Sequence, residues 1–258
     1  SKEREFIQPG AQIIRFQFGP NKYLRKELFW PYLDELSHDL INYYQKFDHQ
    51  EFFIALGYKG DLLKQYFYER SSMYKEGKIE NLNSPILELY IPSLNSNVTL
   101  IDTGESSMTG GRLKRLTNFI KDDTFMLTYG DGLSDININK LIKSHFSSKK
   151  LVTVSAVHPI ARFGELQINS NGTVTSFREK PQVKEGWING GFFVIEPSFL
   201  DYIENDSTIL EKQPLERVAN ELKLNAYIHE GFWHCMDTQR DKETLEEMIK
   251  LGDPPWKN

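Results

Sequence analysis

Cysteine is nearly absent from this sequence, and so are long hydrophobic runs. Cys235 is the only cysteine among 258 residues, which excludes an intramolecular disulfide and gives no sign of an oxidising compartment. No apolar stretch approaches the roughly 18 residues of a membrane-spanning helix, and no apolar signal-peptide region stands near the N-terminus. We therefore expect a soluble, cytoplasmic protein.

Basic residues are also fewer than acidic residues. Lys and Arg number 31 against 36 Asp and Glu, so the net charge is −5 and the pI is about 5.8. A nucleic-acid-binding protein usually presents a basic face, so we expect neither a nucleic-acid partner nor a membrane partner. The 39% hydrophobic and 13% aromatic content is typical of a packed globular chain. A few well-placed basic residues could still bind a small phosphorylated ligand.

The first 157 residues alternate between strand and helix patterns. Strands are expected at 11–18, 51–56, 98–102, 124–128 and 151–157, and helices at 34–47, 61–70, 112–120 and 137–146. Such alternation predicts an α/β fold with a doubly wound, mostly parallel, Rossmann-like sheet covered by helices on both faces. Ligands bind beyond the carboxyl ends of the strands in such sheets, so the loops after strands matter most for function.

The pattern changes after residue 157. Strands at 163–168 and 172–177 flank Asn171-Gly172, a strong hairpin signal. Further strands are expected at 190–195 and 226–229, and helices at 198–204, 211–222 and 239–251. No linker, repeat or low-complexity tract is present. We expect one domain over 1–258, in which 158–258 form an antiparallel elaboration on the sheet of 1–157.

The stretch TGESSMTGGRLKR at 103–115 joins an expected strand to an expected helix. Gly110 and Gly111 would let backbone N–H groups approach a ligand closely. A helix N-terminus favours anions, and Arg112 adds a cation. The same pattern also fits an ordinary strand–loop–helix link with a solvated basic face.

The stretch TYGDG at 128–132 follows an apolar strand. A carboxylate such as Asp131 at that position, between glycines, could hold Mg²⁺ against a polyphosphate, because Mg²⁺ takes one or two protein carboxylates. The alternative is a turn aspartate. In GFWHCMDTQRD at 231–241, Asp237 could be a second metal carboxylate. His234 and Cys235 do not form a convincing metal pair, since adjacent strand side chains face opposite ways.

Two further stretches offer groups that suit a phosphorylated sugar. In FREKP, Lys180 could pair with a phosphate and Glu179 could accept hydrogen bonds from hydroxyls, although a surface ion pair is the simpler interpretation. In WINGGFFVI, Gly190 and Gly191 permit close approach, and Asn189 can donate and accept. A β-bulge or turn is equally consistent with this second pattern.

In their order and spacing, these stretches resemble the sugar-1-phosphate nucleotidyltransferases, and within them the glucose-1-phosphate cytidylyltransferases. The resemblance runs through IALGYKG, MTGGRLKR, LTYGDG, RFGEL, FREKP, INGGFFV, GFWHCMDT and PPWK, roughly four-fifths of the chain. It implies transfer of a cytidylyl group from CTP to a sugar 1-phosphate, with release of pyrophosphate, in bacterial-type surface polysaccharide precursor synthesis. It also implies a homo-oligomer.

The resemblance assigns roles to residues at matching positions. Asp131 and Asp237 would hold Mg²⁺, and Lys180 and Glu179 would bind the sugar 1-phosphate. The remaining positions follow the same mapping: Asn189, Gly190 and Gly191 at the sugar, Gly110, Gly111 and Arg112 by the nucleotide, Tyr129 among the substrate-binding residues, and Gly10 and Arg15 in the triphosphate loop. No side-chain nucleophile is expected, because such phosphoryl chemistry needs mainly positioning and charge stabilisation.

The N-terminal segment departs from the family pattern G-G-x-G-T-R. Gly10 and Arg15 match its first glycine and its arginine in spacing. Ala11 and Ile13, however, stand where the pattern has its other two glycines, and a β-branched Ile disfavours the left-handed backbone. Cys235 also replaces a proline. Two alternatives therefore stay open. One is a catalytically silent homologue that binds nucleotide or sugar phosphate as a regulatory or structural partner. The other is a nucleotide-sugar-dependent glycosyltransferase-like enzyme with Asp131 and Asp135 as its metal pair.

Overall fold

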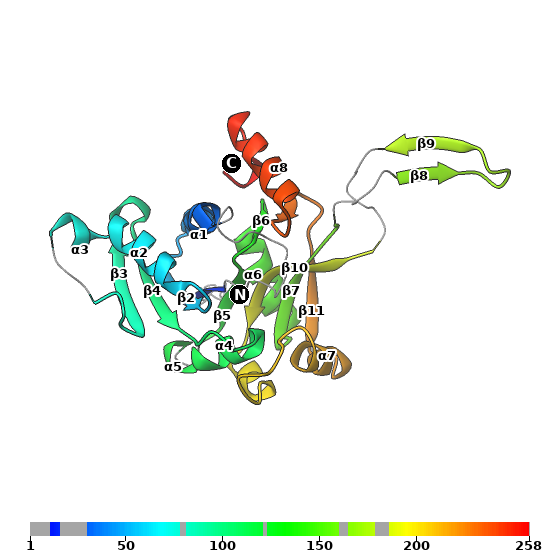
Figure 1. Ribbon diagram of the computed structural model, residues 1–258. Coiled ribbons are helices and arrows are strands. Elements are labelled where there is room, and N and C mark those ends of the chain that lie inside the picture. The colour runs from blue at the N-terminus through cyan, green and yellow to red at the C-terminus, as the bar shows by residue number, and fades with distance from the viewer. Residues whose placement is uncertain are drawn as a thin grey trace, which may run out of the picture.

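A mixed eight-stranded sheet forms the centre of the protein (Figure 1). This computed structural model describes residues 11–15, 30–77, 81–120, 123–159, 165–178 and 186–257. The strand order is β11-β7-β10-β5-β1-β2-β4-β3. These strands are β1 (Ala11–Arg15), β2 (Glu51–Leu56), β3 (Ile86–Ile91), β4 (Ser96–Asp102), β5 (Phe125–Tyr129), β7 (Val152–Val157), β10 (Ile188–Ile195) and β11 (Leu224–Ile228).

The sheet contains both parallel and antiparallel strand pairs. β1, β2, β4 and β5 pair in parallel, whereas β10 lies antiparallel between β5 and β7. The strand order runs outward from β1 in both directions, so a topological switch point lies between β1 and β5. Their last residues, Arg15 and Tyr129, are partners in the register. The predicted α/β fold with a doubly wound, mixed sheet is confirmed.

Helices cover both faces of this sheet. They are α1 (Trp30–Gln45), α2 (Gly60–Arg70), α3 (Ser72–Lys75), α4 (Thr109–Arg115), α5 (Thr117–Ile120), α6 (Ile138–Ser148), α7 (Gln213–Asn220) and α8 (Gln239–Lys250). Residues of α1, α2, α6 and α8 belong to one buried cluster, and residues of α4, α5 and α7 to the other. Within the described residues, no helix is both long and apolar enough to cross a membrane.

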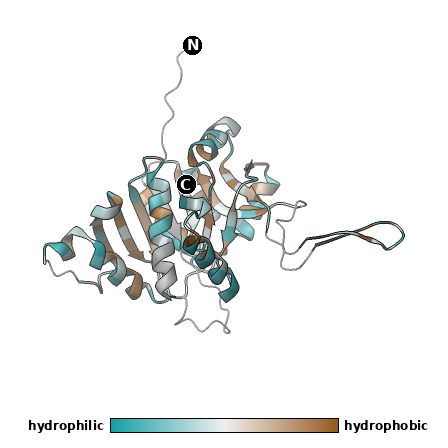
Figure 2. Ribbon diagram, turned by 90° about the horizontal axis from the view of Figure 1, so that it is seen from above, coloured by the Kyte–Doolittle hydropathy of each residue, from teal (hydrophilic) through white to brown (hydrophobic). Residues whose placement is uncertain are grey.

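Strand β10 is buried on both sides, which explains its uninterrupted apolar run. Phe192 and Val194 belong to one cluster, and Phe193 and Ile195 to the other. Successive side chains of a strand point to opposite faces, so each face of the sheet receives two of these four residues. Figure 2 shows the hydrophobic strands enclosed between more polar helices.

Several element predictions need correction. The strand expected at 11–18 is not among them, since it is present over Ala11–Arg15 and residues 16–18 lie outside the described residues. The helix that follows β4 begins at Thr109, where it was expected to open, but it does not run unbroken to residue 120, because it is divided at Leu116 into α4 and α5. The segment 198–204, predicted as α-helix, is a 3₁₀ helix over Pro197–Tyr202. Strand β3 was missed, although its alternating burial has the period of two that predicts a strand.

Two short ladders stand apart from the large sheet. β6 (Gly132–Ser134) pairs antiparallel with β12 (Trp233–Cys235), and β8 (Glu165–Ile168) pairs antiparallel with β9 (Val174–Arg178). The second ladder is the predicted hairpin, and Gly172 at its turn has a φ of 84°. This hairpin projects away from the body of the molecule (Figures 1 and 2).

Candidate functional site

Three of the predicted motifs meet at one edge of the sheet. β5 ends at Tyr129, just before Asp131. Because β10 runs antiparallel to β5, the Asn189–Gly191 segment at the start of β10 lies at that same edge. The short β6–β12 ladder then brings the segment that ends in Asp237 to the residues that follow β5. The edge is the carboxyl side of the parallel strands, where open α/β sheets bind their ligands.

Asp131 and Asp237 are held close together by backbone pairing. Cys235 is the register partner of Gly132, and the Met236 N–H donates to the Asp131 carbonyl oxygen at 2.8 Å. Potential ligand atoms of Asp131, Cys235 and Asp237 all lie within 4.8 Å of one another. The Asp241 carboxylate accepts from the Asp237 N–H at 3.1 Å, so the start of α8 also fixes the Asp237 backbone.

This group fits a hard divalent cation better than a soft one. Two carboxylates supply the oxygen ligands that Mg²⁺ prefers and leave its other positions to water and phosphate. Burial, followed by the nearby carboxylates of Asp131 and Asp237, raises the pKa of the Cys235 thiol. A thiolate there would suit a softer metal, but a protonated thiol is a poor ligand for Mg²⁺. The two aspartates are therefore the candidate metal ligands.

The Asn189-Gly190-Gly191 segment is fixed by contacts with two other motifs. Asn189 Nδ2 donates to the Tyr129 hydroxyl at 3.2 Å, and its Oδ1 accepts from the Gly191 N–H at 2.8 Å. Gly191 has a φ of +80°, and a Cβ there would lie 2.6 Å from the Tyr129 ring. Trp233 Nε1 donates to the Gly190 carbonyl at 2.8 Å. Glycine at 191 is thus needed for backbone conformation and for space beside Tyr129.

Gly110 and Gly111 were expected to bring backbone N–H groups close to a ligand, but they contact another part of the chain. Their N–H groups donate to the Thr208 carbonyl at 2.9 and 3.3 Å, so they do not point at a ligand. A Cβ on Gly111 would meet the Asp206 carbonyl oxygen at 2.3 Å. The glycines allow α4 to pack on the backbone of residues 206–208. These two N–H groups are therefore not available to a nucleotide, contrary to what the motif suggested.

Arg112 is likewise turned inward rather than toward a phosphate. Its side chain is 5% exposed, and its Nη1 donates to the Leu56 carbonyl, the Thr103 hydroxyl and the Gly104 carbonyl, each at 2.9 Å. A Cβ on Gly57 would lie 2.3 Å from the guanidinium, so this glycine provides the space it occupies. Arg112 therefore ties the end of β2 to the loop after β4.

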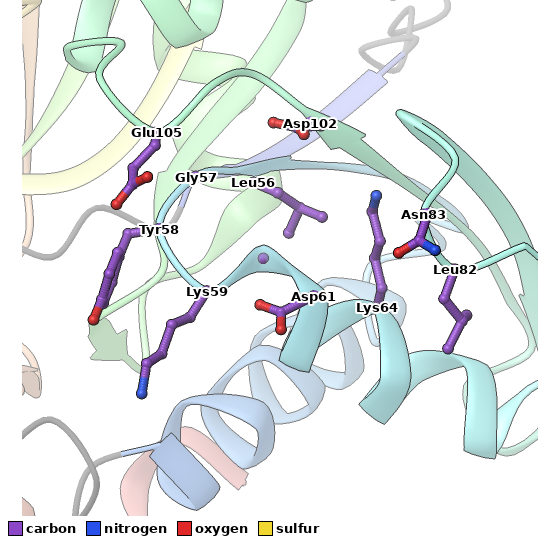
Figure 3. Close-up of a pocket in the computed structure, with 11 residues that line it drawn as sticks. Leu56, Gly57, Tyr58, Lys59, Asp61, Lys64, Leu82, Asn83, Asp102 and Glu105 are labelled. Carbon is purple, nitrogen blue, oxygen red and sulfur yellow. The ribbon is translucent and has the colours of Figure 1, made fainter.

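That tie shapes one wall of a cavity of about 410 Å³ (Figure 3). The cavity lies at the carboxyl ends of β2 and β4 and is lined by both signs of charge, Lys59 and Lys64 against Asp61, Asp102 and Glu105. The Lys64 ammonium is nearly buried and donates to the Ser84 carbonyl oxygen. None of the predicted site residues that the structure describes lines this cavity, so Arg112 influences it only through the backbone that it holds.

The N-terminal assignments need a correction and leave some residues untested. Residues 11–15 form β1, which pairs with β2 on one side and β5 on the other, so their amides lie in a central strand and not in a phosphate-binding loop. The roles of Gly10 and Arg15 in binding the triphosphate stay predictions. Arg15 itself ends β1, next to Tyr129 in the register. Gly10, Glu179 and Lys180 lie outside the described residues.

Sequence reasoning missed one polar residue that connects two of the motifs. Glu211 Oε1 accepts from the Tyr129 hydroxyl at 2.7 Å, and its Oε2 accepts from the Thr109 hydroxyl at 2.6 Å. The glutamate stands in an unremarkable polar stretch, 82 residues from one partner and 102 from the other. No local pattern could have identified it.

Comparisons with known proteins agree with this geometry. The model of the nucleotidyl transferase family matches residues 79–235. The chain is 44% identical over 210 residues to the glucose-1-phosphate cytidylyltransferase of Salmonella typhimurium, covering 81% of each. It is 34% identical over 219 residues to the probable glucose-1-phosphate cytidylyltransferase of Bacillus subtilis, covering 84% of this chain and 85% of the relative.

Solved structures support the same fold. The crystal structure of HddC from Yersinia pseudotuberculosis matches with a TM-score of 0.63 at 20% identity, covering 93% of this chain and 99% of that one. Fold and site together define an α/β protein with a doubly wound sheet and a carboxylate pair just beyond the carboxyl end of β5. The chain belongs to the nucleotidyl transferase family, and the resemblance found in its motifs is confirmed.

Proposed function

We propose that this protein transfers the cytidylyl group of CTP to glucose 1-phosphate, giving CDP-glucose and pyrophosphate as a precursor for surface polysaccharide. The observation that carries the proposal is the 44% identity to a glucose-1-phosphate cytidylyltransferase over 81% of both chains. That alignment is long enough to include most of the motifs from which the resemblance was drawn. A nucleoside triphosphate donor also implies a cytoplasmic location, which belongs to the proposal.

The proposed reaction needs no protein nucleophile. A phosphate oxygen of the sugar 1-phosphate attacks the α-phosphorus of CTP, a new P–O bond forms, and the bond to pyrophosphate breaks. Asp131 and Asp237 would hold Mg²⁺, which when bound neutralises charge on the phosphates. The chain's own part is to orient the two substrates and to keep the aspartates at fixed spacing, since positioning and charge stabilisation dominate such catalysis.

The sugar 1-phosphate would lie beside the start of β10. Asn189 offers an exposed polar side chain there, and the buried Gly190 and Gly191 hold it in place through the bonds of their backbone to Trp233 and Asn189. Glu179 and Lys180 would bind a sugar hydroxyl and the phosphate, and Arg15, at the end of β1, would contribute charge at the switch point. The antiparallel register of β10 with β5 supports this placement, because it sets the Asn189 segment next to the residues that precede Asp131.

Neither alternative is favoured. A glycosyltransferase-like metal pair of Asp131 and Asp135 finds no support, because Asp135 pairs with His229 at 2.9 Å and lies outside the acidic group that contains Asp237. A silent homologue would have no need to keep two aspartates within 4.8 Å of each other across 106 positions of sequence. Residues 11–15 lie in a central strand, so Ala11 and Ile13 are strand residues and their identity is no argument for a silent homologue.

We also propose that the protein assembles with copies of itself. Four apolar side chains, Leu166, Ile168, Val174 and Phe177, share one face of the β8–β9 hairpin and are 48 to 64% exposed. A two-stranded hairpin is marginally stable in water unless its apolar face is covered. No described segment covers this face, which projects from the body in Figures 1 and 2, and a second copy carries the identical apolar surface.

A pyrophosphate-release assay tests the activity. The purified protein is incubated with Mg²⁺, glucose 1-phosphate and each of CTP, UTP, GTP and dTTP in turn. We expect the fastest release with CTP and detection of CDP-glucose by mass spectrometry. Absence of turnover with all four triphosphates, while glucose 1-phosphate and CTP still bind in calorimetry, would establish the silent homologue instead.

A further inference from the structure

Glu211 joins two motifs that lie far apart in the sequence. Its two carboxylate oxygens accept from different hydroxyls, Tyr129 at 2.7 Å and Thr109 at 2.6 Å. Thr109 is the first residue of α4, and Tyr129 is the last residue of β5. The carboxylate is therefore a bridge between the helix after β4 and the carboxyl end of β5.

In the hydrogen bond between Thr109 and Glu211, the threonine hydroxyl is the donor. The Thr109 oxygen accepts from the Leu210 N–H at 2.6 Å, and its own proton goes to Glu211. Thr109 is 6% exposed, so this arrangement is shielded from water. A hydroxyl that receives a backbone N–H on one side is well oriented to donate on the other. Glu211 thus takes its place from the same backbone that packs against Gly110 and Gly111.

A second chain of hydrogen bonds joins Glu211 to Asn189, the residue expected at the sugar. Because the Tyr129 hydroxyl donates to Glu211, it presents a lone pair to Asn189 Nδ2, which donates to it at 3.2 Å. The Oδ1 of the same amide accepts from the Gly191 N–H at 2.8 Å, so the amide has one orientation that satisfies both bonds. The chain of donors runs from Asn189 through Tyr129 to Glu211.

We propose that Glu211 is a positioning residue for the acceptor substrate, acting through Tyr129 on the orientation of Asn189. This inference rests on the proposed function, because it assumes that the Asn189 segment receives the sugar 1-phosphate. Glu211 needs both of its oxygens as acceptors. A glutamine keeps the length and shape of the side chain but replaces one acceptor with a donor, so one of the two hydroxyls loses its partner.

The test separates positioning from general stability. We compare Glu211→Gln with the matched control Glu221→Gln. The Glu221 carboxylate accepts from the Tyr202 hydroxyl at 2.5 Å. Glu221 directly follows α7 and does not belong to the candidate site. For Glu211→Gln we expect the KM for glucose 1-phosphate to rise at least tenfold, with less than a twofold change in the KM for CTP. For Glu221→Gln we expect both KM values to stay within twofold of the unaltered protein. Thermal unfolding of both variants monitors folding.

A second variant and a second readout keep the inference open to contradiction. Tyr129→Phe removes the hydroxyl that links Glu211 to Asn189, so it should give the same selective rise, and the double variant should add little to either change. Calorimetric binding of glucose 1-phosphate, expected to weaken at least tenfold in Glu211→Gln, reports on the inference even without turnover. Equal rises in both KM values, or an unchanged affinity for glucose 1-phosphate, would overturn the positioning role. Failure of the unaltered protein to release pyrophosphate would instead overturn the proposed function.

Discussion

The backbone N–H of Met236 donates to the backbone carbonyl of Asp131 at 2.8 Å, 105 residues away in the sequence. This bond extends the three-residue pairing of β6 with β12 by one step. Of the two candidate metal ligands, Asp131 is itself a partner in this bond and Asp237 follows its other partner, so main-chain pairing sets the distance between them. Such a site is assembled by folding itself and does not depend on the metal to bring its ligands together.

Replacing either carboxylate should remove most activity. Asp131→Asn and Asp237→Asn each keep the side-chain shape but lose a negative charge at the proposed Mg²⁺ site. We expect kcat to fall about 10²-fold or more, in line with the loss of one electrostatic stabiliser, and the Mg²⁺ needed for half-maximal rate to rise. Initial rates across a Mg²⁺ titration measure both quantities.

The matched control for these variants is Asp135→Asn. Asp135 follows Asp131 by four positions, but its carboxylate pairs with His229 at 2.9 Å. We expect its kcat and Mg²⁺ dependence to stay within a few-fold of the unaltered protein. A loss equal to that of Asp131→Asn, with Asp237→Asn still active, would move the metal site to the pair that a glycosyltransferase-like enzyme needs.

Gly111→Ala should destabilise the protein although it lies in a helix. Alanine is about 1 kcal/mol more favourable than glycine in a helix interior. At this position, however, the new Cβ would lie 2.3 Å from the Asp206 carbonyl oxygen, and backbone must move. We expect the free energy of unfolding, measured with urea, to fall by about 1–3 kcal/mol, the usual penalty of overpacking. Gly132→Ala is the control, because its Cβ would meet no atom closer than 3.8 Å. A more stable Gly111→Ala protein would refute the packing role of this glycine.

Because of His49, the free energy of unfolding should fall in mild acid. Burial lowers its pKa from 6.5 to about 4, against a smaller opposing effect of Asp48. The unfolded chain therefore takes up a proton below about pH 6.5 that the folded protein refuses until about pH 4, so stability falls as the pH drops through this window. At pH 4.5 the loss relative to pH 7 is about 2–3 kcal/mol from this residue. His49→Gln removes the titrating group, so the difference in unfolding free energy between pH 7 and pH 4.5 should shrink by that amount. An unchanged difference would show that the ring is protonated in the folded state.

The apolar face of the hairpin should control assembly. Phe177→Lys places a charge in the middle of the exposed apolar face, so we expect a smaller mass in size-exclusion chromatography with light scattering. Gln167→Lys is the control, because Gln167 follows Leu166 along β8 and so points to the opposite face of the hairpin. A mass that is the same for the unaltered protein and both variants would contradict assembly through this face.

The sequence predicted most long elements because their patterns are local. The apolar runs of β2, β5 and β10 and the spacing of α2, α6 and α8 needed no knowledge of distant partners. β6 and β12 have three residues each, too few for any periodicity, and they pair across about 100 positions. The short ladder that assembles the acidic pair was therefore invisible, although both aspartates themselves were found from their motifs.

Glycine and arginine patterns were harder to interpret than carboxylates. A Gly-Gly pair at a helix start allows close approach of either a ligand or another stretch of backbone, and only the position of Asp206 distinguishes the two. Arg112 poses the same problem, since a guanidinium suits phosphates and carbonyls alike. Glu211 had no signal at all, because its partners become its neighbours only through the fold.

The place of β10 in the sheet has a consequence for how the chain is made. β5 and β7 leave the ribosome early, yet β10, the strand that lies between them, is not available until residues 188–195 have been synthesised. The nascent chain therefore carries two unpaired strand edges facing an empty slot, and edges of that kind recruit other chains. A ribosome stalled before residue 188 should hold an aggregation-prone chain, and a nick near residue 157 should not release two separately folding halves.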